Sequence, residues 1–478
     1  MKSVHCLKFI AKGIATRFKS APVILALAVS ASQLSGQSVT YEGYGFATIG
    51  GQGGDTYHVT TLADGGSGSL RDGAINRAGP RTIVFDVGGT ITITNQFIIN
   101  RPYLTIDGST APSPGITLTK VYDTNEFKIG GTHDIIVQHL RLLGLYQRGA
   151  DAGPNNTDFM QIDGDSGPDH HAQNIVVDHI TVLNATDSGM DIWGEVSDVT
   201  VSWCLIANSF HPSTVSFYPA PFQKRRRISM HHNVWARNDE RNPQLRADVA
   251  DFDYVNNIIY DWGYWTHYGY GIRIKNDPGE PHVSGNFINN YFKPVHGDPT
   301  AALLYGLNDG ADSNDGGPLI PVPQGTVITN SLMGALWVSG NVLPVGNMDH
   351  YSTIPAPNPV PTNAQVTTYS AYELRDRVVP NAGTNYRTPE EQAMFAEITS
   401  ALAGPSQPKI LSITSTNCVL EINTASGFLN DLQVSDSFTA PNWKSLTNFV
   451  GDGSLVTITD APIGLSSRFY RVLSTVLP

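Results

Sequence analysis

Cysteine is scarce in this chain, with three among 478 residues. Cys6 lies in an N-terminal segment that we expect to be removed, while Cys204 and Cys418 lie far apart in regions of different composition. Two isolated cysteines in so long a chain do not indicate a disulfide-stapled fold, so we expect two buried free thiols. No Cys/His spacing typical of a zinc site is present, which argues against zinc chemistry.

Charge is also sparse, and positive charge especially so. Charged residues make up 15% of the chain, and the formal net charge is -12. A deficit of positive charge argues against nucleic acid as a partner. It also works against binding an anionic substrate. We therefore expect a local solution, in which a strip of basic side chains and a bound cation offset the overall negative field.

Long hydrophobic runs are absent apart from residues 21–29, which follow five basic residues and precede small ones. A run this short is typical of a secretory signal peptide rather than of a membrane span. We predict a signal peptide over residues 1–36 and a secreted protein, extracellular or periplasmic. We expect the mature chain to have no membrane span and to be a monomer.

Glycine and proline are plentiful, with 46 and 30 residues, which favours many short strands and turns. A short pattern of alternating apolar and polar residues recurs at 134–139, 174–179, 198–203, 227–232, 252–257 and 281–286. After the first gap the copies recur every 24 to 29 residues or so, about one coil of a parallel β-helix. A β-sandwich would need hairpin turns at shorter spacing, and no consistent hairpin turns separate the copies. The sequence therefore predicts an all-β parallel β-helix.

The ends of this solenoid carry helix signals. Residues 69–77 are typical of a short amphipathic helix that caps the first strand, which we expect at 82–85. Thr388-Pro-Glu-Glu391 is a capping box with proline at the first helical position, and it predicts a helix to about residue 403 that caps the far end. After Pro408 short alternating strands follow, typical of a small β-sandwich-like domain. We thus expect a signal peptide (1–36), a β-helix (37–404) and a small C-terminal β-domain of unknown role (405–478).

The run Arg241-Asn-Pro-Gln-Leu-Arg246 carries the strongest chemical signal. Guanidinium groups bind carboxylates in bidentate fashion. Upstream, at the edges of strand-like segments, lie hard oxygen ligands of the kind Ca²⁺ prefers, namely Asp158, Asp187 and Asp191. Paired guanidiniums beside such acids suit the gripping and deprotonation of an acidic sugar on a calcium ion, which is eliminative cleavage of a polyuronate. Surface ion pairs and turn-capping aspartates remain the alternative interpretation.

Several motifs resemble polysaccharide lyase family 1, the pectate lyases, over roughly residues 41–404. The resemblance implies a right-handed parallel β-helix, in agreement with the repeat, and a secreted enzyme that uses calcium to cleave polygalacturonate, or pectin more broadly, by β-elimination. The matching motifs are Gly43-Tyr-Gly45, Gly68-Ser-Leu-Arg-Asp72, Thr105-Ile-Asp-Gly108, Val177-Asp-His179, Asp187-Ser-Gly-Met-Asp191, His231-His-Asn233 and the run from Arg241 to Arg246.

The resemblance also implies a calcium site. The family's D-x-D pair of ligands matches Asn156-Thr-Asp158, in which an amide replaces the first carboxylate. The family's two acids four residues apart match Asp187 and Asp191. We therefore expect Ca²⁺ as cofactor, held by Asn156, Asp158, Asp187 and Asp191, and bound weakly without substrate because one carboxylate is missing.

Arg241 matches the catalytic arginine of the family, which takes the proton from C5 of the uronate. Arg246 and Arg273 match arginines that bind substrate carboxylates. His211 falls near a substrate-gripping lysine of the family, and Lys224 is a further candidate for that function. A base role is demanding for arginine, since its side chain is almost always protonated and the pKa shift required is large.

Other functions fit parts of the sequence. A pectin lyase, which takes methylated pectin without calcium, is favoured by Trp193, Trp262 and Trp265. A hydrolase would use acids on adjacent coils and leave the arginines unexplained. A non-catalytic glycan-binding β-helix is favoured by the departures from the family at Asn156 and His211.

Two basic groups invite a simpler interpretation. His139, His179 and His232 occupy the same register in three coils, which favours a stacked ladder over catalysis. The run Lys224-Arg-Arg-Arg227 predicts an exposed basic loop near the site.

Overall fold

The structure is a computed structural model of the chain. It describes residues 40–121, 127–145, 159–164, 170–185, 187, 189–216, 226–246, 249, 251–267, 269–276, 283–299, 302–307, 320–321, 336–344, 366–402, 408–413, 417–423, 428–437, 442–451, 455–461 and 468–476. The predicted signal peptide and the candidate site residues Asn156, Asp158 and Lys224 lie outside these ranges. The chain divides into two compact units, one of residues 41–403 and one that contains residues 404–478.

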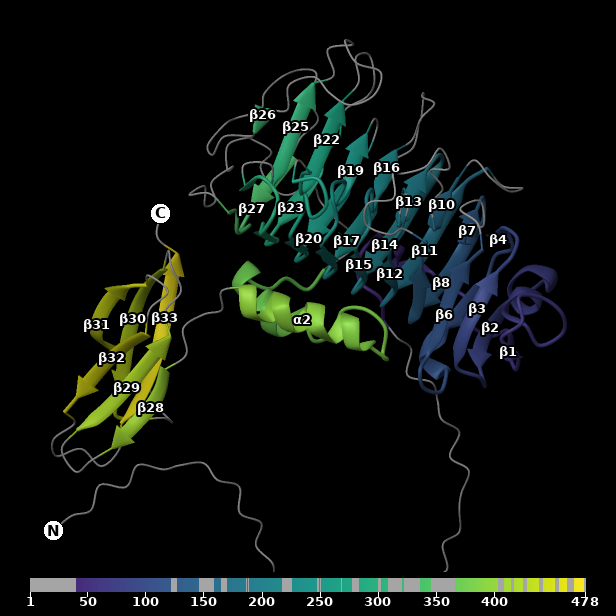
Figure 1. Ribbon diagram of the computed structural model, residues 1–478. Coiled ribbons are helices and arrows are strands. Elements are labelled where there is room, and N and C mark those ends of the chain that lie inside the picture. Colours follow the sequence, from purple (N-terminus) through teal and green to yellow (C-terminus); the bar gives the residue numbers. More distant parts are fainter. Residues whose placement is uncertain are drawn as a thin grey trace, which may run out of the picture. The chain divides into compact units, whose positions relative to one another are not determined.

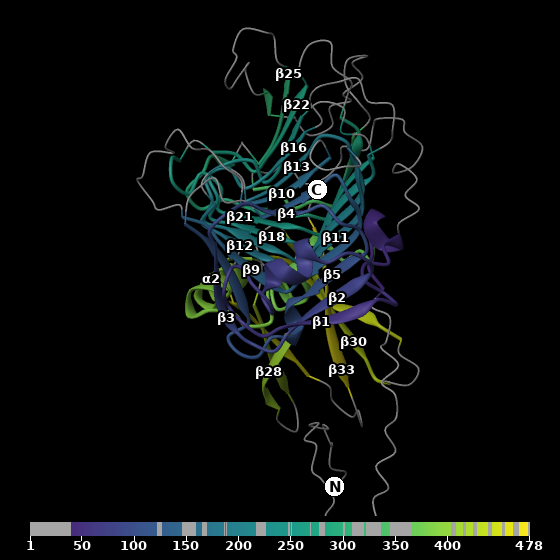
Figure 2. The ribbon, with the colours of Figure 1, turned by 90° about the vertical axis from the view of Figure 1, so that its right-hand side faces the viewer.

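Three parallel sheets form the larger unit (Figure 1). From β2 to β25, consecutive strands lie in different sheets, and the next three strands pair with them in the same order, so that β11, β12 and β13 stack on β8, β9 and β10. In Figure 2 the strands of the three sheets lie on three sides of a common interior. The predicted parallel β-helix is confirmed, with one antiparallel pair between β25 and β26.

Sheet A comprises β1 (Asp55–Val59), β2 (Arg81–Phe85), β5 (Leu104–Asp107), β8 (His133–Gln138), β11 (Ala172–Asp178), β14 (Val196–Ser202), β17 (Ile228–His231), β20 (Phe252–Val255), β23 (Gly285–Ile288) and β27 (Leu336–Ser339). Sheet B comprises β3 (Gly89–Ile93), β6 (Ile116–Lys120), β9 (Leu140–Leu143), β12 (Thr181–Leu183), β15 (Leu205–Ala207), β18 (Val234–Ala236), β21 (Ile258–Tyr260) and β24 (Tyr291–Lys293). Sheet C comprises β4 (Phe97–Ile99), β7 (Phe127–Gly130), β10 (Met160–Asp163), β13 (Met190–Trp193), β16 (Thr214–Ser216), β19 (Gln244–Arg246), β22 (Ile272–Asn276), β25 (Leu303–Leu307) and β26 (Ile320–Pro321).

The interior is filled by alternate residues of each strand. Because the strands are parallel and in register, a core position in one coil lies directly on the same position in the next. One such column on sheet A is fully buried, and its members are Val177, Val201, Met230, Tyr254 and Phe287.

The corners explain the polar ends of the sequence repeat. At many bends the backbone adopts a left-handed conformation, which L-residues other than Asn, Asp and His adopt rarely. Residues with a left-handed backbone lie at or near the start of the sheet A strands, namely Asp134, Asn174, Asp198, Arg227 and Asp251. A second set lies just after these strands, namely His139, His179, Trp203, His232, Asn256 and Asn289. A third set follows the sheet B strands, at Asn184, Asn208, Arg237 and Asp261. The polar residues at the ends of the sequence repeat therefore mark the positions at which the chain turns from one sheet to the next.

A column of buried amides ties the C-terminal coils together. Asn233, Asn257, Asn290 and Asn341 each donate from Nδ2 to a backbone carbonyl of the preceding coil, and each Oδ1 accepts from a backbone N–H one coil earlier. The same position is apolar in the two coils before, where it is occupied by Ile180 and Cys204.

The sixth sequence repeat, predicted at 281–286, is wrong in register. Asn286 pairs with Asp253, and Asn290 takes the position in the amide column that follows Asn257. The buried amide, which needs its partners on both neighbouring coils, fixes the alignment. The first strand was likewise misplaced, because β1 precedes the helical turn η2 (Asp72–Asn76) and pairs with β2.

Helix α2 (Pro389–Ala401) begins at Thr388 with the predicted capping box, but its predicted place at the end of the solenoid is wrong. It lies along the outside of sheet B (Figure 1), after the short helices η5 (Ala371–Glu373) and α1 (Leu374–Arg377). Phe395 and Ile398 pack there with outward-facing residues of sheet B such as Leu205, Val234 and Ile258. These strands are apolar on both faces, so the outer face must also be covered.

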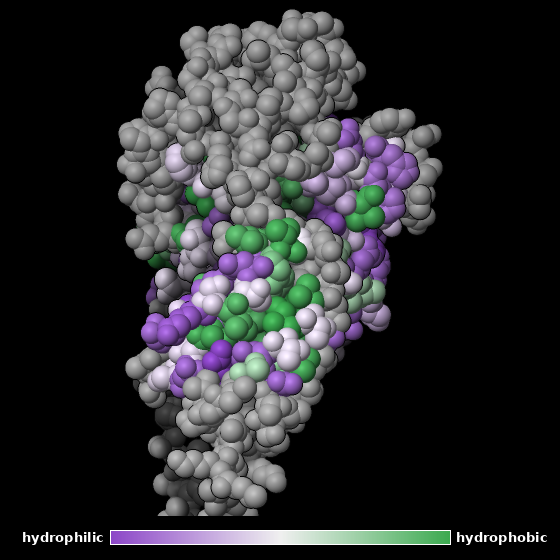
Figure 3. Space-filling model, turned by 90° about the vertical axis from the view of Figure 1, so that its left-hand side faces the viewer, coloured by the Kyte–Doolittle hydropathy of each residue, from purple (hydrophilic) through white to green (hydrophobic). Residues whose placement is uncertain are grey.

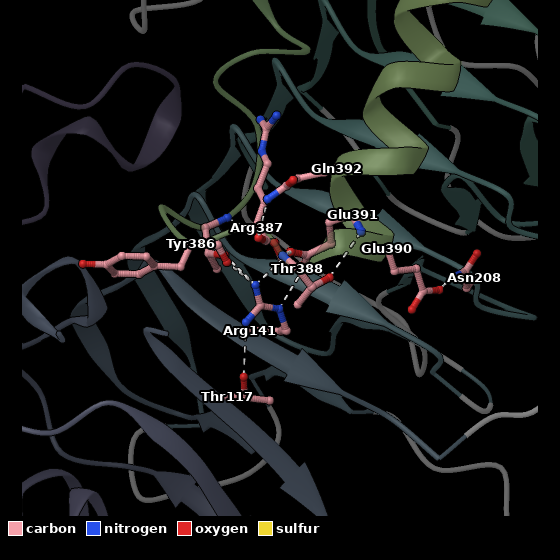
Figure 4. Close-up of polar contacts among 11 residues, drawn as sticks. Thr117, Arg141, Asn208, Tyr386, Arg387, Thr388, Glu390, Glu391 and Gln392 are labelled. Atoms are coloured by element: carbon pink, nitrogen blue, oxygen red, sulfur yellow. Dashed lines mark hydrogen bonds and ion pairs between the residues drawn. The ribbon is translucent and has the colours of Figure 1, made fainter. Parts of the chain in front are cut away.

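A cluster of polar contacts fixes the start of α2 to the solenoid (Figure 4). Arg141 on β9 forms a bidentate pair with Glu391, with both N–O distances at 2.8 Å. It also donates to Thr117, Thr384 and the carbonyl of Tyr386. Both members of the ion pair are buried.

The N-terminal segment before β1 crosses sheet A. Helix η1 (Tyr44–Ala47) is anchored by the backbone N–H groups of Tyr44 and Gly45, which donate to Ser229 and Thr200. Gly45 is required there, because a Cβ would lie 2.5 Å from the carbonyl oxygen of Ile175. A further short helix, η3 (Gly108–Thr110), follows β5.

The smaller unit contains two three-stranded antiparallel sheets, β28-β29-β32 and β31-β30-β33, which confirms a small β-sandwich-like domain. Its core is modest and holds Leu420, Ile422 and Leu432 with the thiol of Cys418. Hydrophobic side chains reach the surface beside hydrophilic ones on the face of the molecule shown in Figure 3. The strands are β28 (Pro408–Ile413), β29 (Cys418–Asn423), β30 (Phe428–Ser435), β31 (Lys444–Val450), β32 (Leu455–Asp460) and β33 (Phe469–Val476).

Both cysteines of the described residues, Cys204 and Cys418, are buried and form no disulfide, as predicted. No helix among the described residues is long and apolar enough to span a membrane.

Candidate active site

Two of the predicted arginines, Arg246 and Arg273, and one predicted acid, Asp191, lie on the outer face of sheet C. In β13, β19 and β22 the apolar residues Ile192, Leu245 and Ile274 point into the core, so Asp191, Arg246 and Arg273 point outward. The chain thus brings together on one surface residues that are up to 82 positions apart in sequence.

A row of polar side chains crosses this face where the strands begin. Asp191 accepts a hydrogen bond from the backbone N–H of Thr214 on the next strand. Thr214 pairs in register with Gln244, and Gln244 pairs with Arg273. With strands about 4.8 Å apart, the row from Asp191 to Arg273 is about 14 Å long. It presents an acid at one end and a guanidinium at the other.

The corner before these strands holds four charged or titratable side chains from three consecutive coils. Nδ1 of His211 lies 2.7 Å from Oδ1 of Asp187, and its Nε2 lies 2.9 Å from Oε1 of Glu240. Arg241 lies against both acids, with Nη1 3.9 Å from Asp187 and Nε 3.5 Å from Glu240. His211 therefore bridges two acids, and we call Asp187, His211 and Glu240, with Arg241 lying against them, the corner strap. Both ring nitrogens of His211 are engaged, which leaves neither directed to a substrate carboxylate in this conformation.

Partial burial and mutual charge set the protonation of this strap. Burial alone would raise the pKa of the Asp187 carboxyl, but the hydrogen bond and charge of His211 outweigh it and lower that pKa. The pKa of Glu240 is lowered for the same reason, against the effect of its burial. Burial opposes a charged His211, yet hydrogen bonds to the two acids raise its pKa.

Arg241 is held in its charged form. Burial by itself would lower the pKa of the guanidinium, but the nearby carboxylates of Glu240, Asp187 and Asp191 favour its charged form, and its pKa is raised. The backbone of Arg241 is left-handed, with φ of 59°. Its position is thus fixed both by the chain and by its neighbours.

Tyr270 lies near both Arg241 and Arg273. Its hydroxyl donates to Oε1 of Gln244 at 2.9 Å, and the guanidinium of Arg273 lies 5.7 Å from the centre of its ring. Burial, above all, raises the pKa of Tyr270, so the phenol is neutral. Arg273 is itself only 4% exposed, so a substrate reaches at most the end of its side chain.

The donor chemistry at this corner fits a calcium ion. Asp187 and Asp191 offer hard carboxylate oxygens near Arg241, and carboxylates are the ligands that set calcium affinity. The remaining predicted ligands, Asn156 and Asp158, lie outside the described residues.

Other groups of possible metal ligands lie away from this corner. Within the described ranges, His139, Asp178 and His179 have ligand atoms within 4.8 Å of one another. The two imidazoles stack face to face with centroids 4.6 Å apart, so their lone pairs run side by side rather than to one point. The stack continues through Trp203 to His232, which confirms the predicted ladder. A second group, Glu42 with His231 and His232, lies under the N-terminal segment.

The basic run at 224–227 was predicted to be exposed, and for Arg226 this is wrong. Its side chain is 1% exposed and lies 3.7 Å from Glu195, while Arg227 pairs with Asp198. The alternation of the strand that follows turns Arg226 toward the solenoid.

Glu240 and Tyr270 were missed from the sequence. For Glu240 a signal was present: Asp187, His211 and Glu240 are separated by 24 and 29 residues, the same steps that separate Asn174, Asp198 and Arg227. Equal steps place residues at the same corner of consecutive coils. No comparable signal marks Tyr270, which lies in a longer turn.

No protein-family model matches the chain. Among curated proteins, it is 35% identical over 265 residues to the probable pectate lyase C of Aspergillus flavus, covering 55% of each chain. It is 32% identical over 289 residues to the probable pectate lyase C of Neosartorya fischeri, covering 60% of this chain and 61% of that protein. The chain thus spans a little more than half the length of these relatives.

Solved structures that align with the chain include the cedar pollen allergen jun a 1, with 16% identity and a TM-score of 0.45 over 72% of this chain and 92% of that one. A pectate lyase from Bacillus sp. N165 in complex with trigalacturonate aligns with 18% identity and a TM-score of 0.43, over 72% of this chain and 98% of that one. The curated homologues of this chain are therefore proteins named pectate lyase, and the resemblance to polysaccharide lyase family 1 is confirmed.

Proposed function

We propose that this protein is a calcium-dependent pectate lyase that cleaves polygalacturonate by β-elimination. One observation carries the proposal: Arg241 lies against Asp187 at a corner of the solenoid, beside the outward row that includes Asp191 and Arg273. The proposal thus rests on a guanidinium beside carboxylate oxygens, next to a polar row about 14 Å long. The homologues named pectate lyase support the same reading.

The proposed binding roles follow from charge. Arg246 and Arg273 bind uronate carboxylates through guanidinium–carboxylate pairs. The proposed calcium ligands are Asn156, Asp158, Asp187 and Asp191. A bound Ca²⁺ would neutralise the uronate carboxylate and thereby make the neighbouring C5–H more acidic. His211 keeps Asp187 in place instead of meeting the substrate, and Lys224 stays a candidate for that contact.

The proposed base is Arg241, which takes the C5 proton. The bond from C4 to the glycosidic oxygen then breaks, a C4–C5 double bond forms, and the leaving oxygen takes up a proton from solvent. In the substrate-free site the neighbouring carboxylates favour the charged guanidinium. The base role therefore requires that some of this negative charge be engaged elsewhere when substrate is bound. Asp187 is the residue that contacts Arg241 and is also a proposed calcium ligand.

The test is release of unsaturated uronate, followed by its ultraviolet absorbance. We expect product from polygalacturonate in calcium, and none after a chelator is added, with recovery on renewed calcium. Chelator-resistant product from methylated pectin would replace the proposal by a pectin lyase. Saturated oligosaccharides would indicate a hydrolase, and retention of the polymer without any product would indicate a glycan-binding protein.

We also propose that the chain is secreted after removal of residues 1–36 and acts as a monomer. Expression of the full chain in a secreting host should yield a protein whose N-terminal sequence begins near residue 37, with the mass of one chain by light scattering. A cell-bound protein that retains residues 1–36, or a dimer mass, would contradict these two proposals.

A further inference from the structure

Glu240 is the member of the corner strap to which neither the sequence motifs nor the proposed reaction assigns a function. Its carboxylate lies 2.9 Å from Nε2 of His211 and 3.5 Å from Nε of Arg241. The side chain is 20% exposed, so these contacts are shielded from most of the solvent. A partly buried carboxylate between an imidazole and a guanidinium holds both more firmly than a surface pair would.

The two acids of the strap divide the contacts of Arg241 between them. Both contacts are ion pairs rather than hydrogen bonds: Asp187 approaches Nη1 at 3.9 Å, and Glu240 approaches the Nε edge more closely, at 3.5 Å. In the proposed reaction Asp187 also has to serve a calcium ion. Glu240 is then the carboxylate that stays with the arginine when the site is loaded.

The strap also fixes Glu240 itself. His211 links it to Asp187, so three consecutive turns of the solenoid are joined at this corner. Glu240 and Arg241 are adjacent in the chain, the backbone of Arg241 is left-handed, and their side chains approach to 3.5 Å. The ion pair with Glu240 therefore lies at the Nε edge of the guanidinium and not at its terminal nitrogens.

We propose that Glu240 is a positioning residue for Arg241: it holds the guanidinium in the orientation needed to reach the C5 proton, and it does not touch the substrate. The inference rests on the proposed lyase function. A misplacement of about 1 Å in a reacting group can cost about 100-fold in rate. Loss of Glu240 should therefore act on turnover rather than on substrate binding.

The decisive experiment compares Glu240→Gln, Glu240→Asp and Glu240→Ala on polygalacturonate at saturating calcium. We expect kcat to fall about 10- to 100-fold in Glu240→Gln and Glu240→Ala, with KM within about threefold of the original. Glu240→Asp, which keeps the charge on a shorter arm, should fall in between. Formate should restore part of the kcat of Glu240→Ala, because it can enter the space left by the side chain.

Glu397→Gln is the matched control. Glu397 pairs with Arg237, which lies in the same turn as Arg241 but belongs to the flank covered by α2. Its kcat and KM should stay unchanged. Thermal unfolding of each variant, monitored by circular dichroism, shows whether lost turnover comes from lost structure.

The outcomes separate the two proposals. An inactive original protein refutes the lyase function itself. An active original protein whose folded Glu240→Gln and Glu240→Ala variants keep or exceed its kcat refutes the positioning role. A loss confined to KM would place Glu240 in substrate binding and likewise refute it. If formate does not raise the kcat of a folded Glu240→Ala variant, the lost turnover comes from altered structure and the inference is overturned.

Discussion

Replacing Glu391 by glutamine is expected to destabilise the larger unit by leaving Arg141 buried without its counter-charge. Arg141 is 5% exposed, and its guanidinium makes two 2.8 Å contacts to this one carboxylate. Removing one partner of a buried ion pair typically costs about 3–5 kcal/mol. Glutamine at this position still serves in a capping box, so the start of α2 keeps its cap and the loss reports the ion pair.

The size of the effect can be converted into a melting shift. Unfolding entropy is about 2.1 cal/mol/K per residue, so a unit of roughly 360 residues has an unfolding entropy of about 0.8 kcal/mol/K. A loss of about 3–5 kcal/mol then lowers the unfolding midpoint by about 4–6 °C, provided that the unit unfolds as a whole. Differential scanning calorimetry at a fixed scan rate measures this shift.

Glu390→Gln supplies the matched control for this experiment. Glu390 is on the same first turn of α2 but is exposed and accepts a 3.2 Å hydrogen bond from Asn208. Its replacement removes the same charge from the same helix terminus at a cost below about 1 kcal/mol. Adding Arg141→Met to Glu391→Gln should recover part of the loss, because no unpaired charge then stays buried. Equal midpoints for Glu391→Gln and Glu390→Gln would refute the reasoning.

Three further predictions concern other parts of the chain. Burial raises the pKa of Asp253 to about 7, so the folded state holds this proton more tightly than the unfolded chain. The free energy of unfolding should therefore fall as pH rises from about 4 to about 7, by up to about 4 kcal/mol. Asp253→Asn should abolish that slope in chemical denaturation at a series of pH values, and an unchanged slope would exclude Asp253 as its source. Arg241→Lys should lower kcat by about two orders of magnitude or more without a change in melting temperature, since lysine keeps the charge but not the planar fork; near-normal turnover would remove Arg241 as the base. Asn156→Asp should lower the calcium concentration for half-maximal activity, because it adds a carboxylate to the proposed site; an unchanged calcium titration would exclude Asn156 as a ligand.

The fold was largely predictable because the repeat has a physical origin that is visible in the sequence. Each coil needs left-handed corner residues, and Asn, Asp and His tolerate that conformation best, so polar residues recur at the ends of alternating strands. Where the corner residue is atypical, as at Arg227 or Trp203, the strand pattern still marks the coil. The same logic failed at 281–286, where a strand-like run lies near the true strand but out of its register.

The placement of α2 was not predictable from its own sequence. Its capping box fixes where it begins, but what it covers depends on the outer face of sheet B. A strand such as β15 is apolar at every position, which indicates that both of its faces are buried. The sequence does not indicate which element covers the outer face. The helix was therefore assigned to an end of the solenoid when it belongs on its side.

The site shows the same division. Asp187, Asp191 and the arginines were found as sequence motifs because they lie close together in the chain or repeat a familiar spacing. Glu240 and Tyr270 gain their significance only from the coils above and below them. Contacts between coils connect residues about 24 to 29 positions apart, and only a sequence comparison made at that interval reveals them.

The asparagine column has a consequence for how the solenoid responds to temperature. From Asn233 onward, each coil is tied to the next by amide hydrogen bonds, whereas the same position in the earlier coils is filled by Ile180 and Cys204. Apolar contacts lose strength in the cold, and hydrogen bonds do not share that loss. On cooling, the N-terminal coils should therefore lose stability before the coils from Asn233 onward. Sensitivity to cold should thus decrease along the axis of the solenoid, from its N-terminal to its C-terminal end.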